Sequence, residues 1–273
     1  MPDYIPDSKI KSVSLVGFAA DFTCVNAAVA MQLQTYIIHL ERARSREGQV
    51  KRLLNAMPGA VQVVNAVDGT ATNTRRHTNY HRHLLTPAYP FELLPAEIAA
   101  FLSHQACWRK LLDSGCEAAL IFEDDVEINH SEFASALELV LKQMKQGDII
   151  RLPVKQRERP GHIVAEHQNK VLFEPNTVGL GMQAQLLTAS AAKKLLEASS
   201  IFDRPVDVFL QLRWHHGVRV LSVSRSGVTE VSDKLGGSLI QIHGNKMMLP
   251  YREVMRAIYR ARVACRSQFE ATK

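Results

Sequence analysis

The chain has 273 residues, of which 46% are hydrophobic, so it can bury one substantial core and is not a disordered polypeptide. Its net charge of +6 favours an anionic substrate, an anionic membrane surface or nucleic acid as a partner. The sequence has no zinc-finger spacing and no RNA-binding aromatic motif, so we expect no nucleic acid partner and favour a sugar nucleotide or a phosphorylated lipid.

The cysteines and the N-terminal segment both favour a reducing compartment. The 4 cysteines are widely scattered and include no CxxC pair, which is typical of free thiols. Residues 13–31 are moderately apolar, but Asp21 and Asn26 interrupt them, so they form neither a convincing transmembrane helix nor a signal peptide. We therefore expect residues 1–33 to be a poorly defined N-terminal extension of a cytoplasmic protein.

The first periodic segments predict a βαβ unit. Residues 34–40 are β-branched and aromatic and predict a buried strand. Residues 41–54 predict a helix with Ser45 as its N-cap, and residues 60–67 predict a second strand that ends at the Asp68-Gly69 turn. This spacing predicts parallel pairing of the two strands. Residues 70–89 are polar and predict an irregular excursion.

A long helix is predicted from Pro95 to about residue 115, because proline is well suited to a first helical turn. Glu97, Phe101, His104 and Trp108 recur at helical spacing and share one stripe. A histidine on such a stripe is usually a core residue with a satisfied hydrogen bond. The sequence leaves open whether His104 has that role or lies at a site.

Residues 120–128 run from a buried-strand pattern into three consecutive carboxylates, Glu123, Asp124 and Asp125. Adjacent like charges raise one another's pKa unless a cation or a donor-rich ligand neutralises them. One interpretation is a solvated turn; the other is a metal site. Strand alternation predicts that Glu123 and Asp125 face one side, where they could share a metal, and that Asp124 faces a ribose or a backbone donor.

The second half of the chain predicts further strands and helices in alternation. A basic amphipathic helix closes it, with arginines at 252, 256, 260, 262 and 266. The predicted helices are residues 131–145 and 190–199, the predicted strands are 148–153, 178–187, 218–223 and 238–242, residues 164–173 predict a hairpin arm, and 206–212 form a short apolar segment around Asp207.

Taken together, these segments resemble glycosyltransferase family 25, which comprises bacterial lipooligosaccharide galactosyltransferases and animal collagen galactosyltransferases. His39 and Glu41 stand where the family commonly carries Asn and Asp. The resemblance covers residues 34–240 and rests on YIIHLERARSR at 36–46, AVDG at 66–69, LPAEI at 94–98 with LSH at 102–104 and Trp108, FEDDV at 122–126, and, more weakly, DRPVD at 203–207.

The resemblance implies an α/β, GT-A-like nucleotide-sugar transferase fold, which is a mixed, mostly parallel open sheet flanked by helices. It would occupy residues 34–245, with the basic amphipathic helix at 246–273. Ligands of such sheets bind beyond the carboxyl ends of the strands. The expected function is inverting, metal-dependent transfer of a hexose, most simply galactose, from a UDP-sugar to a lipooligosaccharide or lipopolysaccharide core acceptor.

The resemblance also assigns site residues. Glu123 and Asp125 would hold Mn²⁺ or Mg²⁺, since hard oxygen ligands suit those ions. Asp207 is the first choice for the general base that deprotonates the acceptor hydroxyl, followed by Glu230 and Asp203. The expected nucleotide-sugar contacts are Arg42, Arg46, Asp68, His104 and Asp124.

Three alternatives stay open at this stage. The chain could be a non-catalytic sugar- or nucleotide-binding protein on a degenerate transferase fold. It could be a carboxylate-metal phosphotransferase or phosphatase, although that chemistry needs an acidic nucleophile early in the fold. The C-terminal helix, residues 251–273, could either pack on the domain as a surface helix or bind an anionic membrane, which would place the protein peripherally on the inner face of the cytoplasmic membrane.

Overall fold

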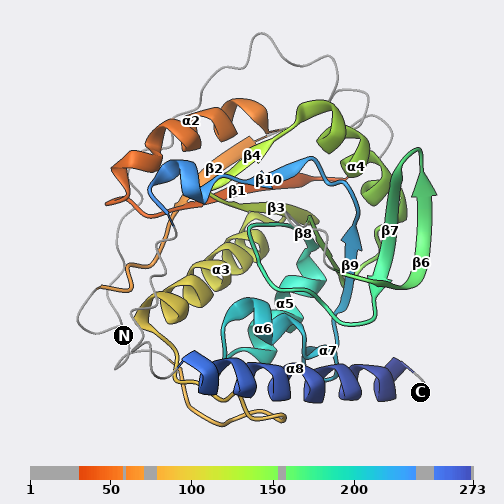
Figure 1. The fold of residues 1–273 in the computed structure, drawn as a ribbon. Helices are drawn as coiled ribbons and strands as arrows, with labels where there is room; N and C mark the ends of the chain where they lie inside the picture. Colours follow the sequence, from red (N-terminus) through yellow and green to blue (C-terminus); the bar gives the residue numbers. More distant parts are fainter. Residues whose placement is uncertain (1–30, 58–59, 71–78, 153–157, 238–248, 272–273) are drawn as a thin grey trace.

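The computed structural model describes residues 31–57, 60–70, 79–152, 158–237 and 249–271. An eight-stranded sheet, with strand order β2-β1-β3-β8-β5-β9-β7-β6, forms the centre of the molecule (Figure 1). Its strands are β1 (Leu33–His39), β2 (Ala60–Asn65), β3 (Ala118–Glu123), β5 (Asp148–Arg151), β6 (Pro160–His167), β7 (Lys170–Pro175), β8 (Ala184–Thr188) and β9 (Arg219–Val223).

The sheet is mixed and mostly parallel, as predicted. β1 pairs in parallel with both β2 and β3, which confirms the βαβ unit, and β5 pairs in parallel with β9. β8 runs antiparallel between β3 and β5, and β7 runs antiparallel between β9 and β6. Among the described strands of this sheet, β8 and β7 are thus the two that run against the others.

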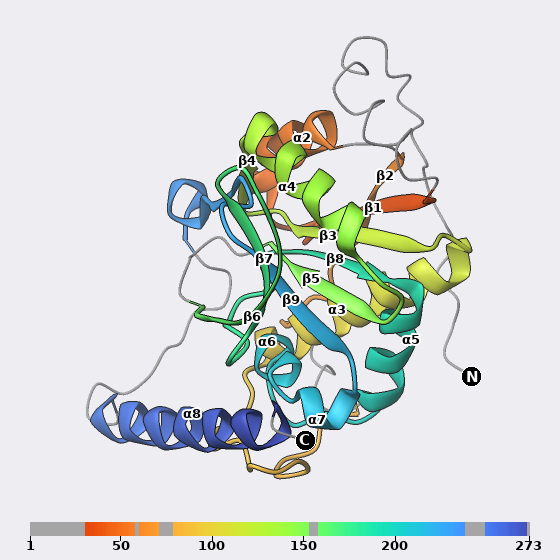
Figure 2. The same ribbon diagram turned by 90° about the vertical axis from the view of Figure 1, so that its right-hand side faces the viewer.

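Helices cover both faces of the sheet, as the two views in Figures 1 and 2 show. β3 alternates between the two cores: Ile121 belongs to the layer with α3 and α5, whereas Leu120 and Phe122 belong to the layer with α4. The helices are α2 (Glu47–Ala56), α3 (Pro95–Ser114), α4 (His130–Gln143), α5 (Ala189–Ala198), α6 (Val206–Leu210), α7 (Arg213–His216) and α8 (Leu249–Ala271), with short 3-10 turns η1 (Arg44–Arg46) and η2 (Ser232–Leu235).

The helix after β1 begins later than predicted. The chain forms η1 first, and α2 starts at Glu47. Arg46 stands at the N-cap position of α2 and makes no side-chain capping hydrogen bond, so Ser45 is not the N-cap. Arg46 is only 3% exposed and points inward. The segment that ends in η1, with Arg46 pointing inward, therefore stands where the sequence predicted the first helical turn.

Two other predictions for the second half were wrong in detail. Residues 164–173 are not one arm, since β6 and β7 form a hairpin that turns at Gln168, whose φ is +53°. The strand predicted at 178–187 is shorter, because only Ala184–Thr188 joins the sheet. The apolar segment around Asp207 is helical, as α6. The strand predicted at 238–242 and most of the N-terminal extension lie outside the described residues.

Candidate active site

The acidic run lies at the carboxyl ends of two adjacent parallel strands. β1 ends at His39 and β3 ends at Glu123, which is in register with Ile38. Asp124 and Asp125 do not continue the strand, because the chain turns there before β4 (Val126–Ile128). The predicted division of the three carboxylates by strand alternation therefore does not apply, and their contacts must be taken one by one.

Asp124 is enclosed by protein donors. Arg46 Nη1 donates to its Oδ1 at 2.6 Å, and His39 Nδ1 donates to its Oδ2 at 2.6 Å. Arg46 also donates through Nη2 to the carbonyl of Gly237 at 2.9 Å. Since buried charges are retained where they are paired, Arg46 and Asp124 brace the acidic turn. These contacts occupy both oxygens of Asp124, whereas the buried Nε of Arg46 has no partner among the described residues, so the predicted contacts with a ribose and a phosphate stay predictions.

Asp125 is paired far less completely. Its Oδ2 lies 3.4 Å from Arg46 Nη1, and its buried Oδ1 has no hydrogen-bond partner among the described residues. Burial, together with the nearby charge of Glu123, raises the pKa of Asp125 from 3.8 to about 7, against the opposing effect of Arg46. Asp125 is thus a buried carboxylate whose charge is only weakly compensated.

Glu230 joins this acidic cluster from another part of the chain. β10 (Val228–Glu230) pairs antiparallel with β4, which sets Glu230 opposite Val126, and Val231 N donates to the carbonyl of Asp125 at 2.8 Å. The charge of Glu230 contributes to the raised pKa of Asp125. Glu230 and Asp125 therefore lie near each other, beside the acidic run of residues 123–125.

The chemistry of this cluster fits a divalent cation. Within the described ranges, no group of three or more His, Cys, Asp and Glu side chains is arranged to hold a metal by itself. Mg²⁺ and similar ions are commonly bound through one or two carboxylates plus substrate phosphates. Glu123 and Asp125, with the unpartnered Oδ1 of Asp125, match that kind of incomplete protein site.

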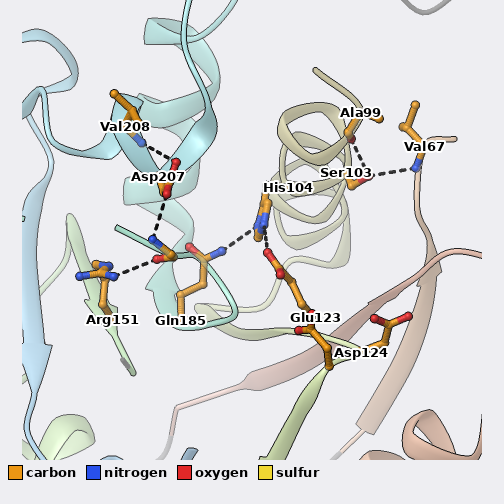
Figure 3. A network of polar contacts seen from close by, with 12 residues as sticks. Val67, Ala99, Ser103, His104, Glu123, Asp124, Arg151, Gln185, Asp207 and Val208 are labelled. Carbon is orange, nitrogen blue, oxygen red and sulfur yellow. Dashed lines mark hydrogen bonds and ion pairs between the residues drawn. The ribbon is translucent and has the colours of Figure 1, made fainter. Parts of the chain in front are cut away.

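His104 supports Glu123 from α3. The Nε2 of His104 lies 3.2 Å from Glu123 Oε1, and its Nδ1 lies 2.9 Å from Gln185 Nε2 on β8 (Figure 3). An ionised carboxylate only accepts, so Nε2 carries the proton and Nδ1 accepts from the Gln185 amide. His104 is buried and orients Glu123, and its predicted contact with a nucleotide sugar stays a prediction.

Asp207 lies on the opposite side of Gln185 from His104 (Figure 3). Its Oδ2 accepts from Gly181 N at 3.0 Å and its Oδ1 accepts from Val208 N at 2.8 Å. Burial raises the pKa of Asp207, and the charge of Glu123 adds to that effect. A half-buried aspartate with a raised pKa, near enough to the acidic run to be influenced by the charge of Glu123, has the properties of a proton acceptor.

Asp203 has a structural role. It is buried, its two oxygens accept from Arg204 Nε and Nη2 at 2.6 and 3.0 Å, and its Oδ2 also accepts from the backbone N–H groups of Leu84 and Leu85 at 2.9 Å. Its oxygens are thus occupied by protein donors, and the residue is only 1% exposed, so an acceptor hydroxyl has no access to it. Asp203 is therefore unsuited to the role of general base.

Arg42 and Asp68 form an exposed pair beyond the carboxyl end of β2. Arg42 Nε donates to Asp68 Oδ2 at 2.8 Å, and this contact lowers the pKa of Asp68 to about 2. Gly69 keeps the turn close to α3, because a Cβ there would lie 2.8 Å from the backbone of Ala96. The pair stays accessible at the rim of the sheet edge, so both residues remain candidates for nucleotide contact.

Sequence reasoning missed three residues that shape the site. His39 and Gln185 are described above, and Arg151 at the end of β5 pairs with Glu158 and donates through Nη2 to the carbonyls of Leu180 and Gly181 at 3.0 and 2.8 Å. Arg151 thereby fixes the loop that presents Gly181 N to Asp207. The sequence held a signal for two of them: His39 stands where the family commonly carries Asn, and Gln185 is a polar residue inside the apolar run AQLLT.

The chain is similar in sequence to known proteins of one family. A family model described as Glycosyltransferase family 25 (LPS biosynthesis protein) matches residues 32–210. Human procollagen galactosyltransferase 2 is 29% identical over 197 residues, which is 67% of this chain and 30% of that protein. Mouse inactive glycosyltransferase 25 family member 3 is 30% identical over 193 residues, covering 65% and 31%. The chain therefore spans about 30% of the length of these relatives.

Among solved structures, the chain is similar to mannose-1-phosphate geranyltransferase from Thermus thermophilus. The TM-score is 0.37 and the identity 10%, over 72% of this chain and 77% of that one.

Proposed function

Because the chain belongs to glycosyltransferase family 25, we propose that it is an inverting, metal-dependent transferase that moves galactose from UDP-galactose to a lipopolysaccharide or lipooligosaccharide core acceptor. The observation that carries this proposal is that Asp125 and Asp207 are two differently held carboxylates, both near enough to Glu123 for its charge to raise their pKa values. Asp125 has a buried oxygen without a partner among the described residues, and Asp207 is held by two backbone N–H groups.

Glu123 and Asp125 would hold Mn²⁺ or Mg²⁺, which when bound supplies positive charge to the departing diphosphate. The protein's own part is to keep these two carboxylates in position. His104 fixes Glu123 through its Nε2, and Arg46 holds the turn at Asp124 from the other side. Both supports are buried, so they exclude water from the back of the site.

Asp207 would take the proton from the acceptor hydroxyl as it attacks the sugar. The N–H groups of Gly181 and Val208 fix the orientation of its carboxylate, and its raised pKa makes it a stronger base than an exposed aspartate. Glu230 lies with the acidic cluster, so it is the second choice for this role.

The choice of sugar and acceptor comes from the relatives. Relatives matched over about two thirds of this chain are named procollagen galactosyltransferases, which supports galactose. The family's description as an LPS biosynthesis protein supports a core saccharide carried by a lipid. None of the helices in the described residues has the length and apolar content needed to cross a bilayer. Work on a glycolipid would take place at the cytoplasmic face of a membrane, where we propose a peripheral location.

A second candidate is a non-catalytic sugar- or nucleotide-binding protein. It is supported by relatives at 30% identity that are named inactive. The departure from the family pattern at His39, where the family commonly has Asn, would favour this candidate. The structure weakens that argument, because His39 donates to Asp124 and has a place in the site.

The test is a screen of UDP-sugars for hydrolysis and transfer with Mn²⁺, Mg²⁺ or chelator, comparing the wild type with Asp125→Ala. As a matched control, Asp113→Ala removes an exposed carboxylate at the far end of α3. The proposal predicts turnover of UDP-galactose that requires a divalent ion and is lost in Asp125→Ala alone. Metal-dependent binding of UDP without turnover of any UDP-sugar would favour the non-catalytic candidate.

A further inference from the structure

The C-terminal helix α8 has an inner face that attaches it to the catalytic fold. Tyr259 and Val263 are buried and pack with Val208 of α6. The hydroxyl of Tyr259 accepts from Arg204 Nη1 at 2.7 Å. The C-terminal part of α8 lies near α6 and α7 in both ribbon views, and the helix extends beyond them (Figures 1 and 2). Since Val208 follows Asp207 directly, α8 is attached to the element that carries the proposed base.

The opposite side of α8 is also apolar. We call Tyr251, Val254, Ile258, Ala261 and Cys265 the outer stripe; they are three or four residues apart and therefore share one face of the helix. Tyr251, Val254 and Ile258 are 58%, 57% and 41% exposed. Other large exposed apolar side chains in the described part of the chain are dispersed over β2, α3, β6 and several loops, apart from Phe269 near the end of α8.

α8 is a basic helix. Arg260 and Arg262 are exposed, Arg252 and Arg256 lie over the ring of Phe91 at 5.0 and 5.7 Å, and Arg266 is exposed and lies over the ring of Trp214 at 5.3 Å. The helix sequence carries five arginines against two glutamates. An exposed apolar stripe on a helix with excess positive charge suits a surface that is apolar inside and anionic outside, which describes an anionic bilayer. A second copy of α8 would bring like charges together.

We propose that the outer stripe of α8 binds the surface of an anionic membrane, with the helix lying parallel to the bilayer, while the inner face keeps the catalytic fold attached. The two roles left open by the sequence, a packed surface helix and a membrane-binding helix, then belong to opposite faces of one helix. The benefit for a lipid-linked acceptor rests on the proposed function, because it requires Asp207 to be the base. Asp207 lies on α6, which packs against α8. The binding itself does not depend on catalysis.

The test is sedimentation of the full chain with phosphatidylcholine vesicles that contain or lack phosphatidylglycerol, without donor or acceptor. The stripe variant carries Tyr251→Ser, Val254→Ser and Ile258→Ser. The matched control carries Leu112→Ser, Ile163→Ser and Ile201→Ser, which removes as many exposed apolar side chains from other elements. A charge variant carries Arg260→Gln and Arg262→Gln. Thermal unfolding of each variant confirms that it is folded.

We expect binding only to vesicles with phosphatidylglycerol. The apparent affinity should fall by about tenfold or more in the stripe and charge variants, and the control should bind with the affinity of the wild type. A fluorophore on Cys265, with Cys24 and Cys116 replaced by Ser, should report transfer to an apolar environment when those vesicles are added.

Equal binding by wild type and stripe variant would overturn the proposal. So would a wild-type dimer that the stripe variant dissociates, since a second copy would then cover the stripe. The proposal would also be overturned if the Cys265 thiol failed to react with the fluorophore before lipid is added. Another part of the chain would then cover the outer stripe. Vesicle binding by a chain that turns over no UDP-sugar would instead count against the proposed function alone.

Discussion

Arg46 Nη1 lies 2.6 Å from Asp124 Oδ1, and the two side chains are 4% and 6% exposed. The pair joins the turn after β1 to the turn after β3, so the backbone of the acidic run is held by a buried charge from a different part of the chain. Asp124 is thereby neutralised, which leaves Glu123 and Asp125 as the carboxylates available to a ligand.

Arg46→Ala should therefore destabilise the fold strongly. It leaves the buried carboxylate of Asp124 with His39 alone, and removal of one partner of a buried pair costs about 3–5 kcal/mol. Arg42→Ala is the matched control, because the Arg42–Asp68 pair is exposed and worth at most about 1 kcal/mol. The free energies of unfolding from urea titrations give the comparison, and equal losses in the two variants would contradict the bracing role of Arg46.

Asp125 should make the metal-free protein less stable as pH rises. Its pKa is raised to about 7 in the folded chain from 3.8, so the folded state binds the extra proton between those values. The stabilising contribution is complete below about pH 4 and is lost as pH rises through about 7, with a slope of at most ~1.4 kcal/mol per pH unit. Asp125→Asn should flatten this part of the stability profile in chelator. An unchanged profile in Asp125→Asn would show that another group causes the slope.

The sequence predicted the elements that depend on local patterns, and it failed where the site depends on distant contacts. Apolar runs and proline at the start of α3 located β1, β3 and α3 to within a few residues. The contact between Arg46 and Asp124, however, joins positions 78 residues apart, and no local pattern encodes it. Strand alternation directed Asp124 toward a ribose or a backbone donor. β3 ends at Glu123, however, and the chain turns at Asp124, whose carboxylate accepts from the side chains of Arg46 and His39.

Asp207→Asn should abolish most of the transfer while the chain stays folded, at the cost of one of the two hydrogen bonds from Gly181 N and Val208 N, because an amide nitrogen cannot accept. Loss of a general base typically lowers kcat by about 10²–10⁴, while binding of UDP with Mn²⁺ should be unchanged because Asp207 lies opposite the acidic run. In the wild type, the acid limb of the kcat/KM profile should lie at higher pH than for an exposed aspartate, since burial raises the pKa of Asp207 and the base must be deprotonated. Transfer at the wild-type rate by Asp207→Asn would exclude it as the base and direct attention to Glu230.

Gln185→Leu should weaken metal-dependent UDP binding through His104. The amide of Gln185 donates to Nδ1 of this buried histidine, and loss of the donor costs about 1–3 kcal/mol and releases the ring that orients Glu123. Gln143→Leu, at an exposed position near the end of α4, is the control. Calorimetric titration of UDP in the presence and absence of Mn²⁺ measures the effect. If Gln185→Leu binds UDP and Mn²⁺ as the wild type does, Glu123 does not depend on His104 for its position.

Tyr259→Phe should loosen α8 while leaving its outer stripe intact. The substitution removes the hydroxyl that accepts from buried Arg204, and a hydrogen bond to a charged group contributes about 1.5–3 kcal/mol. Arg204 keeps its contacts with Asp203, so the main fold should stay folded, but α8 should be cleaved faster in limited proteolysis. Tyr251→Phe changes the same group at an exposed position of the same helix and should leave the cleavage rate unaltered. Identical proteolysis of both variants would mean that the apolar contacts of Tyr259 and Val263 alone hold α8 against α6.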